Sequence, residues 1–337
     1  MPIRLSRTAV AGIAAAVVVV IGVGITLALT SRPSPVATVA TGTPVVPPPT
    51  ATASPTPAPP TATPEPTPIP TPTPIPLDQA LLDSRLTVLV LGLDSNRWRA
   101  AQGKETNTDA MIVASVNGDH TQIATVAMPR DTVDVPFSDG TYWTGKLNAL
   151  SRFLGIEALR DAMETTLAVD IDYYIQVDMD DFAHLVDAVG GVDVEVPYAL
   201  YDPSLGLYLE AGWQHLDGAT AQYYCRSRKQ DGDYARQARQ QQVLLALAET
   251  LSHPDTEIDP LELLASLDSI QTDIPLDKIP TLVEIGRRSV RAEVSTQVLG
   301  PPRFALFEGI EGPARGWVMI PNIPEMQAYA QAVMGGE

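Results

Sequence analysis

The chain has 337 residues, a single cysteine and a net charge of −18 at pH 7. One cysteine excludes an intrachain disulfide, and the strong negative charge argues against nucleic-acid binding, because a phosphate backbone would be repelled. The length is sufficient for one large domain with a substantial core, together with shorter segments outside it.

The N-terminal part predicts a membrane anchor. Residues 9–29 form a run of 21 residues without a charge. This run is long enough to span a bilayer as a helix and exceeds the apolar stretch of a typical cleavable signal peptide. Arg4 and Arg7 precede it, and positive charge favours the cytoplasmic side, so residues 1–8 are expected inside the cell and the remainder outside. The alternatives are a cleaved signal peptide and a buried core helix.

Residues 30–76 are rich in proline, threonine and alanine. Proline fixes φ and removes backbone donors, so neither a helix nor a sheet is expected there. The segment is interpreted either as a spacer that carries a domain away from the membrane or as a merely tolerated disordered linker. Three arginines and one glutamate give residues 1–76 a net charge of +2, so a whole-chain charge of −18 leaves −20 for the domain at 77–337.

Apolar runs, turn residues and periodic apolar positions predict a mixture of strands and helices in this domain. Strands are expected at 86–93, 110–116, 121–128, 173–177, 192–196, 293–298 and 315–320, and helices at 157–168, 180–189, 240–251, 260–268, 277–288 and 323–334. The stretch 117–120 should form a hairpin, because Asn-Gly accepts positive φ. Gly190-Gly191 should close a helix rather than bind phosphate. The expected fold is α/β, an α-β-α sandwich with a central mixed sheet.

Charged side chains stand where several of these strands end. Asp94 ends the first strand, Asp109 precedes the second, Arg130 and Asp131 follow the third, and Lys146 lies in the next loop. Each carboxylate alone is more simply a solvated residue. Together they suit phosphoryl transfer, in which a magnesium ion takes one or two carboxylates plus phosphate oxygens and basic side chains neutralise the remaining charge.

The densest cationic segment lies later in the chain. Five of the 19 lysines and arginines of the acidic domain fall between positions 226 and 239. Concentrating cations costs self-repulsion unless they meet an anion, and the planar guanidinium group suits phosphate oxygens. The segment therefore predicts a phosphate or pyrophosphate site.

A series of short motifs runs through residues 84–250. These are Leu91-Gly92-Leu93-Asp94, Thr108-Asp109, Met128-Pro129-Arg130-Asp131-Thr132, Lys146-Leu147-Asn148, Ile171-Asp172-Tyr173-Tyr174, Val189-Gly190-Gly191-Val192-Asp193-Val194, Arg226-Ser227-Arg228, Gly232-Asp233-Tyr234, Arg236 and Arg239-Gln240-Gln241. In order and spacing they resemble the LytR-CpsA-Psr family of cell-wall glycopolymer transferases. A single membrane anchor before the domain is also typical of that family.

The resemblance implies a phosphotransferase of the cell membrane with its catalytic domain outside. It would move a glycan phosphate from a polyprenyl-pyrophosphate carrier, whose lipid tail lies in an apolar tunnel, to a peptidoglycan hydroxyl, and release polyprenyl phosphate. The implied roles are Asp94 and Asp109 for Mg²⁺; Arg130, Lys146, Arg226, Arg228, Arg236, Arg239 and Gln240 for substrate; and Asp233, Arg130 and Asp131 for catalysis. The same residues would also serve a pyrophosphatase with water as acceptor, or a non-catalytic scaffold that binds lipid or glycan.

The chain departs from the family pattern on the acceptor side of the site. The family usually has arginine two residues before Asp109, where this chain has Asn107, and Arg97 or Arg99 could replace that charge. The stretch that follows Lys146-Leu147-Asn148 in the family is also only weakly matched.

Three further features carry simpler interpretations. Trp98, Trp143 and Trp213 are expected to be partly buried core residues, with stacking on sugar rings as the alternative. Cys225 is expected to be a small buried hydrophobe rather than a nucleophile. Residues 255–337 show no chemistry of their own and are expected to complete the sheet and its covering helices.

Overall fold

The computed structural model describes residues 76–104, 106–252 and 270–335. Its helices, in chain order, are α2 (Gln79–Leu82), α3 (Arg97–Ala101), η2 (Leu147–Ala149), α4 (Leu150–Leu154), α5 (Ile156–Leu167), α6 (Met179–Ala188), α7 (Gly218–Arg226), α8 (Gly232–Ser252), η3 (Leu276–Lys278), α10 (Ile279–Arg288), η4 (Ser289–Arg291), α11 (Gly312–Arg315) and α12 (Ile323–Met334). Its strands are β1 (Leu86–Leu93), β2 (Thr108–Val116), β3 (Gln122–Ala127), β4 (Val135–Pro136), β5 (Tyr142–Trp143), β6 (Tyr173–Val177), β7 (Val192–Val196), β8 (Leu200–Asp202), β9 (Leu207–Leu209), β10 (Gly212–Leu216), β11 (Gln271–Thr272), β12 (Glu293–Val298), β13 (Ala305–Ile310) and β14 (Trp317–Pro321).

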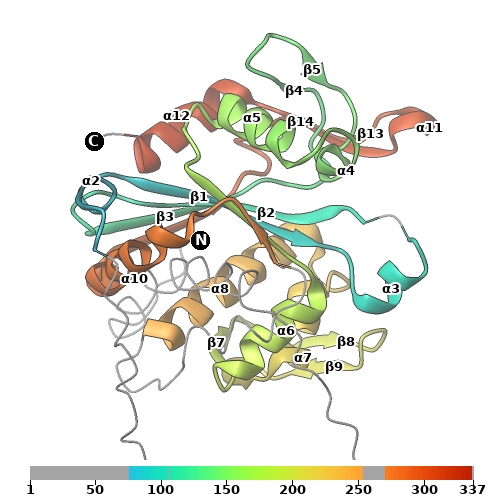
Figure 1. The fold of residues 1–337 in the computed structure, drawn as a ribbon. Coiled ribbons are helices and arrows are strands. Elements are labelled where there is room, and N and C mark those ends of the chain that lie inside the picture. Colours follow the sequence, from blue (N-terminus) through green and yellow to red (C-terminus); the bar gives the residue numbers. More distant parts are fainter. Residues whose placement is uncertain (1–75, 105, 253–269, 336–337) are drawn as a thin grey trace, which may run out of the picture.

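The central sheet has six strands in the order β11-β6-β1-β2-β3-β12. β1, β2 and β3 are antiparallel to one another, whereas β6 pairs with β1 and β12 with β3 in parallel. Helices α5 and α12 cover one face of the sheet, and α6, α7, α8 and α10 lie on the other (Figure 1). The mixed sheet predicted from the sequence is thus confirmed.

Strand β1 shows why the sheet is buried on both faces. Successive strand side chains point to opposite faces. Leu89 and Leu91 pack into the core beneath α4, α5 and α12, while Val88 packs into a separate core with residues of α10 and α8. A strand buried on both sides reads as a continuous apolar run, and this is the pattern of 86–93.

Local signals set the ends of the helices. The Asp178 side chain accepts hydrogen bonds from the backbone N–H groups of Asp180 and Asp181 at the start of α6, and Asp217 caps α7 in the same way. Gly190 and Gly191 follow α6 with φ of 82° and 94°, so the predicted helix-closing role of this pair is confirmed. The core-facing residues of α5 recur at helical spacing, at Leu159, Ala162, Met163 and Leu167.

The hairpin between β2 and β3 forms where it was predicted, but the reason given for it was wrong. Positive φ falls on His120, at 59°, and not on Gly118. Glycine at 118 serves close packing instead, because a Cβ there would lie 2.6 Å from the carbonyl oxygen of Asp83.

The C-terminal part does complete the fold. Strand β12 forms one edge of the sheet, and α10 and α12 cover its two faces (Figure 1). The predicted helix at 260–268 lies outside the described residues. So does the predicted anchor at 9–29; in the parts that are described, no helix is long and apolar enough to cross a membrane.

Candidate active site

The strand ends of the central sheet bring the first set of charged residues to one rim. Leu93 at the end of β1 pairs with Thr108 at the start of β2, and Ala127 at the end of β3 pairs with Ile112. A register shift between Gly92 and Leu93 leaves Asp109 as an extra residue on β2. Such a bulge redirects a side chain and is common beside active sites.

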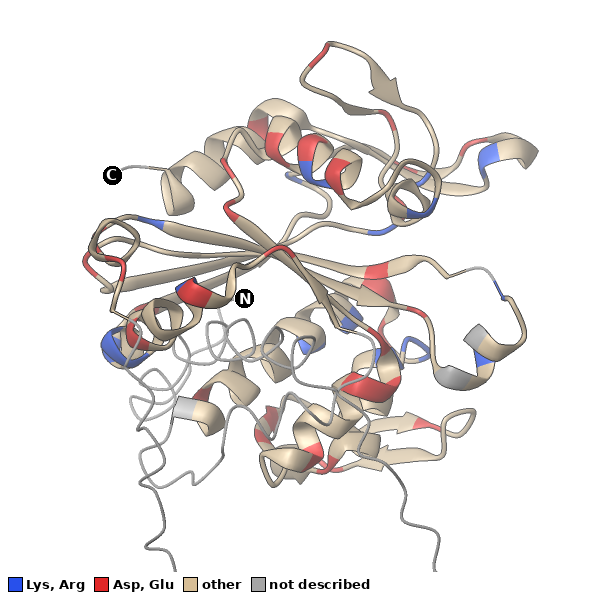
Figure 2. Cartoon of the chain, in the orientation of Figure 1, with Lys and Arg blue, Asp and Glu red and all other residues tan. Residues whose placement is uncertain are grey.

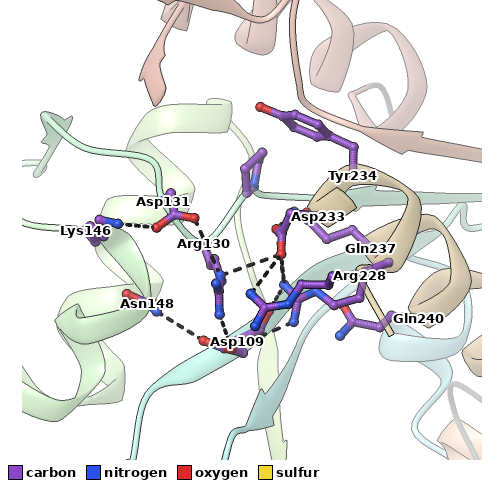
Figure 3. Close-up of polar contacts among 12 residues, drawn as sticks. Asp109, Arg130, Asp131, Lys146, Asn148, Arg228, Asp233, Tyr234, Gln237 and Gln240 are labelled. Atoms are coloured by element: carbon purple, nitrogen blue, oxygen red, sulfur yellow. Dashed lines mark hydrogen bonds and ion pairs between the residues drawn. The ribbon is translucent and has the colours of Figure 1, made fainter. Parts of the chain in front are cut away.

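Arg130 is the centre of the ion pairs at this rim. Its Nη1 lies 2.5 Å from Asp109 Oδ2, and its Nε lies 3.5 Å from Asp131 and 3.6 Å from Asp233 (Figure 3). Burial by itself lowers the pKa of the guanidinium, but the carboxylates of Asp109, Asp233 and Asp131 outweigh burial and raise it. Arg130 is therefore a permanent cation held in one orientation.

One amide and one lysine side chain extend this network of ion pairs toward α4. The Asn148 amide donates to Asp109 Oδ1 at 3.1 Å, and Lys146 Nζ donates to Asp131 Oδ1 at 2.6 Å. Lys146, Asp131, Arg130 and Asp109 thus form a continuous chain of contacts (Figure 3).

Asp233, in the first turn of α8, ties the arginines of the basic segment to this rim. Arg236 lies 3.0 Å from its carboxylate and Arg228 lies 3.7 Å away. Gln237 donates to the other oxygen at 2.9 Å. Burial alone would raise the pKa of Asp233, but Arg236, Gln237 and Arg130 outweigh burial and hold it below its ordinary value. An ionised carboxylate whose pKa lies below its ordinary value orients cations well but is a poor proton acceptor near neutral pH.

Asp109, Arg130, Arg228 and Arg236 border a pocket of about 470 Å³ beneath the sheet, here called the first pocket. Its charged lining comprises Asp94, Arg99, Asp109, Arg130, Asp178, Asp202, Arg226, Arg228, Lys229 and Arg236. Its apolar lining includes Val90 and Ile112 from the sheet and Phe182, Leu185, Leu244 and Leu247 from α6 and α8. The pocket therefore joins a cationic mouth to an apolar interior, which suits a ligand with a phosphorylated head and a hydrocarbon tail.

The basic residues from 226 to 239 fall into two groups, according to whether they line the first pocket. Arg226, Arg228, Lys229 and Arg236 line the first pocket, as does Gln240. Arg239 is not among the residues that line it. Its guanidinium donates instead to the Asp231 carboxylate and to the carbonyl oxygens of Ser227 and Tyr224. The structure thus places Arg239, which was predicted to bind substrate, in the support of the loop before α8.

A profile of the LytR_cpsA_psr family matches residues 67–302. The chain belongs to this family. Among its relatives, the polyisoprenyl-teichoic acid–peptidoglycan teichoic acid transferase TagV of Bacillus subtilis is 31% identical over 238 residues, covering 66% of this chain and 60% of that protein. TagU of Halalkalibacterium halodurans, of the same description, is 33% identical over 57% of this chain and 62% of its own length. The chain thus spans about three-fifths of these relatives.

The fold is shared with a solved member of the family. The crystal structure of B. subtilis TagV matches with a TM-score of 0.61 and 26% identity, over 76% of this chain and 99% of that one. The resemblance stated from the motifs is therefore confirmed at the level of family and fold.

The two carboxylates predicted to hold magnesium line the same pocket in this LytR_cpsA_psr protein. Asp94 lies 3.4 Å from Arg99, and Asp109 contacts Arg130 and Asn148. Within the described residues no group of three or more His, Cys, Asp or Glu side chains could hold a metal alone. Magnesium that is bound with a phosphorylated substrate needs only one or two carboxylates. Two carboxylates on the wall of one pocket match this number, provided that the substrate supplies further oxygens.

The departure from the family pattern at Asn107 has a local counterpart. Arg99, one of the two arginines suggested as a replacement, lines the first pocket beside Asp94. It supplies positive charge at the mouth, although next to a different carboxylate. The side chain of Arg97 lies outside what the structure describes.

Other single-residue predictions had mixed outcomes. Trp98 and Trp213 are 61% and 56% exposed, so the core interpretation is wrong for both, whereas Trp143 is half-buried. Cys225 packs into an apolar cluster, and burial raises the pKa of its thiol to about 12, which agrees with the structural interpretation. Sequence reasoning missed Gln237, whose only signal was its spacing of one helical turn from Asp233.

Proposed function

We propose that this chain transfers a glycan phosphate from a polyprenyl-pyrophosphate carrier to a peptidoglycan hydroxyl and releases polyprenyl phosphate. The observation that carries the proposal is the first pocket, where Arg130, Arg228 and Arg236 meet an apolar interior. A pyrophosphate diester carries about two negative charges, and fixed cations stabilise the additional charge that develops on its leaving phosphate. The relatives named for teichoic acid transfer to peptidoglycan support the direction of transfer.

In the proposed reaction the acceptor hydroxyl oxygen forms a bond to the glycan-bearing phosphorus. The bond from that phosphorus to the bridging oxygen breaks, and its electron pair leaves with polyprenyl phosphate. Arg130 and Arg236 hold the phosphates in place during this exchange. Mg²⁺ bound by Asp94 and Asp109 would neutralise charge on the phosphate oxygens.

The hydroxyl proton needs an acceptor, and two predicted catalytic carboxylates are available. Asp233 has a depressed pKa and does not line the first pocket. Asp131 adjoins Arg130 at 3.5 Å and lines a second pocket, which Arg130 also lines. We therefore assign the proton to Asp131 and the orientation of the arginines to Asp233.

The proposal includes a place in the cell. Residues 9–29 would anchor the chain in the membrane, residues 30–76 would act as a spacer, and the domain at 77–337 would work on the outer side. Protease added to intact cells should then digest the domain. Survival of the domain in intact cells, with digestion only after lysis, would contradict this orientation.

A transfer assay tests the function directly. The full chain in detergent is incubated with a polyprenyl-pyrophosphate disaccharide and peptidoglycan fragments, with Mg²⁺ or with EDTA, and lipid and glycan products are identified by mass spectrometry. Polyprenyl phosphate plus a phosphodiester-linked glycan is expected, and EDTA should abolish it. Free glycan phosphate alone would indicate a pyrophosphatase, and an intact but bound lipid would indicate a scaffold.

The assignment of the proton is tested in the same assay. Asp131→Asn should lower transfer by roughly 10²-fold or more, as loss of a general base does, while binding of the donor lipid is retained. Transfer by Asp131→Asn at the wild-type rate would contradict the assignment.

A further inference from the structure

A second pocket, of about 600 Å³, adjoins the first at Arg130, which lines both. In Figure 3, Lys146 and Asn148 lie on one side of Arg130, and Arg228 and Gln240 lie on the other. The second pocket is lined by Asn107, Arg130, Asp131, Val133, Trp143, Thr144, Gly145, Lys146, Asn148, Ala149, Phe153, Ala314 and Arg315. A ligand in it would therefore share Arg130 with a phosphate held in the first pocket.

The two pockets differ in the chemistry of their walls. The second has no hydrocarbon interior comparable to Leu244 and Leu247 of the first; it offers two aromatic rings and two amides instead. Trp143 and Phe153 stand with their ring centroids 6.0 Å apart. Aromatic faces bind the apolar C–H faces of pyranose rings, and amide groups both donate to and accept from hydroxyls.

The Trp143 ring is fixed to the loop that carries Lys146. The Trp143 indole donates to the carbonyl oxygen of Lys146 at 3.0 Å. Gly145 makes this position possible, because a Cβ there would lie 2.8 Å from the indole ring. Lys146 in turn contacts Asp131 at 2.6 Å. The ring is thus held in place relative to the carboxylate beside Arg130, and preorganisation of this kind favours binding.

Two observations indicate that the part of the second pocket lined by Asn107, Trp143 and Phe153 binds a ligand. Phe153 is 62% exposed although it is a large aromatic residue beside the active site. Asn107 Oδ1 is buried and has no hydrogen-bond partner among the described residues. Buried acceptors are normally paired, so a ligand hydroxyl has an acceptor available in this wall.

We propose that the second pocket binds the acceptor, a glycan strand of peptidoglycan, with a sugar ring against Trp143 and Phe153 and the reacting hydroxyl directed toward Asp131. The inference rests on the proposed transfer function. It places the acceptor near Lys146 and Asn148 and the carrier lipid near Arg228 and Gln240, so that the hydroxyl approaches the phosphorus from the side away from the leaving phosphate.

Binding is tested apart from transfer. The full chain in detergent is titrated with a soluble peptidoglycan tetrasaccharide in the absence of any donor lipid, and binding is measured by calorimetry. Phe153→Ala and Trp143→Ala should each weaken binding by roughly threefold to tenfold, the usual effect of a lost aromatic contact. Trp213→Ala, which removes an exposed tryptophan outside both pockets, is the matched control and should bind as the wild type does.

Kinetics separate a binding role from a general structural one. In the transfer assay, Phe153→Ala should raise KM for the peptidoglycan acceptor and leave KM for the donor lipid unchanged. A melting temperature close to that of Trp213→Ala would show that the variant is folded. Should Trp143→Ala fold poorly, the exposed Phe153 carries the test alone.

The outcomes distinguish this inference from the proposed function. Saccharide binding that is weakened by both variants, in a chain that shows no transfer, would refute the function and leave the pocket assignment standing. Transfer by a wild-type chain combined with wild-type acceptor KM in Phe153→Ala would refute the pocket assignment alone. Absence of tetrasaccharide binding to the wild-type chain would also overturn it.

Discussion

At the rim of the first pocket and at the loop 227–231, an arginine of α8 pairs with an aspartate, but the two pairs have different roles. Arg236 and Arg239, one helical turn apart on α8, are only 4% and 5% exposed, and each contacts an aspartate. Arg236 shares Asp233 with Arg130 and borders the pocket, whereas Arg239 is surrounded by Asp231 and two backbone carbonyls. The positions of the acceptors around a buried arginine therefore decide whether it can serve a substrate or only the fold.

The largest expected effect is on the structural side of this comparison. Arg239→Ala removes the cation beside Asp231, which keeps a hydrogen bond from the Tyr198 hydroxyl, and it takes a donor from two carbonyl oxygens. The loss should lower the free energy of unfolding by about 3–5 kcal/mol. Urea denaturation followed by circular dichroism measures the change. Arg226→Ala, which removes an exposed arginine of the same segment, is the control and should stay within about 0.5 kcal/mol. A stable Arg239→Ala variant without transfer would instead place Arg239 among the phosphate ligands.

Arg130→Ala should act mainly on the reaction. It removes the guanidinium that three carboxylates hold at the junction of the two pockets, and loss of one preorganised donor typically costs about 10²–10³-fold in rate. Transfer is measured by mass spectrometry of the released lipid. Arg287→Ala, on the exposed surface of α10, should transfer at the wild-type rate. Similar losses in both variants would mean that net charge, and not geometry, matters.

Asp233→Asn tests the comparison through the pH dependence of the free energy of unfolding. Because the folded-state pKa of Asp233 is depressed, its contribution to stability is complete above the unfolded value of about 4 and is lost as the pH falls through the lower folded value. The variant should be less stable by about 1.5–3 kcal/mol at pH 7, the range for charged hydrogen bonds. Urea unfolding at pH 7 and pH 3 should show this difference shrinking in acid. A difference that grows in acid would contradict the assigned pKa direction.

The smallest effect is expected at Cys225. With a pKa of about 12, its thiol is almost entirely protonated at pH 8, and it is buried. Only the thiolate reacts readily with alkylating agents. Iodoacetamide should therefore modify Cys225 after unfolding in urea but not in the native protein, as read by mass spectrometry. Rapid modification of the native chain would show that the Cys225 thiol is accessible from the first pocket.

Much of the fold was accessible from the sequence because its signals are local. The run at 86–93, the alternation at 192–196 and the helical spacing at 323–334 each reflect the burial of one short segment. The start of α8 was predicted eight residues too late. Residues 232–239 are largely polar and give no apolar periodicity, because the side chains that are buried there, Arg236, Gln237 and Arg239, are held by ion pairs and hydrogen bonds.

The parts of the site that could not be predicted depend on contacts between distant segments. Arg315 reaches the second pocket from α11, where it is held by Glu311 and Asp134 at 2.8 Å each. Glu308 of β13 accepts a hydrogen bond from Tyr234 of α8. Nothing within 255–337 indicated either contact, because each joins segments more than 70 residues apart in sequence.

Strand β14 fastens the loop that carries Arg130. The N–H of Met319 donates to the carbonyl oxygen of Asp131, and the carbonyl oxygen of Met319 accepts from the N–H of Val133. The ribosome makes this loop nearly 190 residues before it makes Met319, so these two hydrogen bonds can form only late in synthesis. A chain that ended before β14 would keep the backbone hydrogen bonds of this loop to Leu147 and Asn148 but lose both of those to Met319.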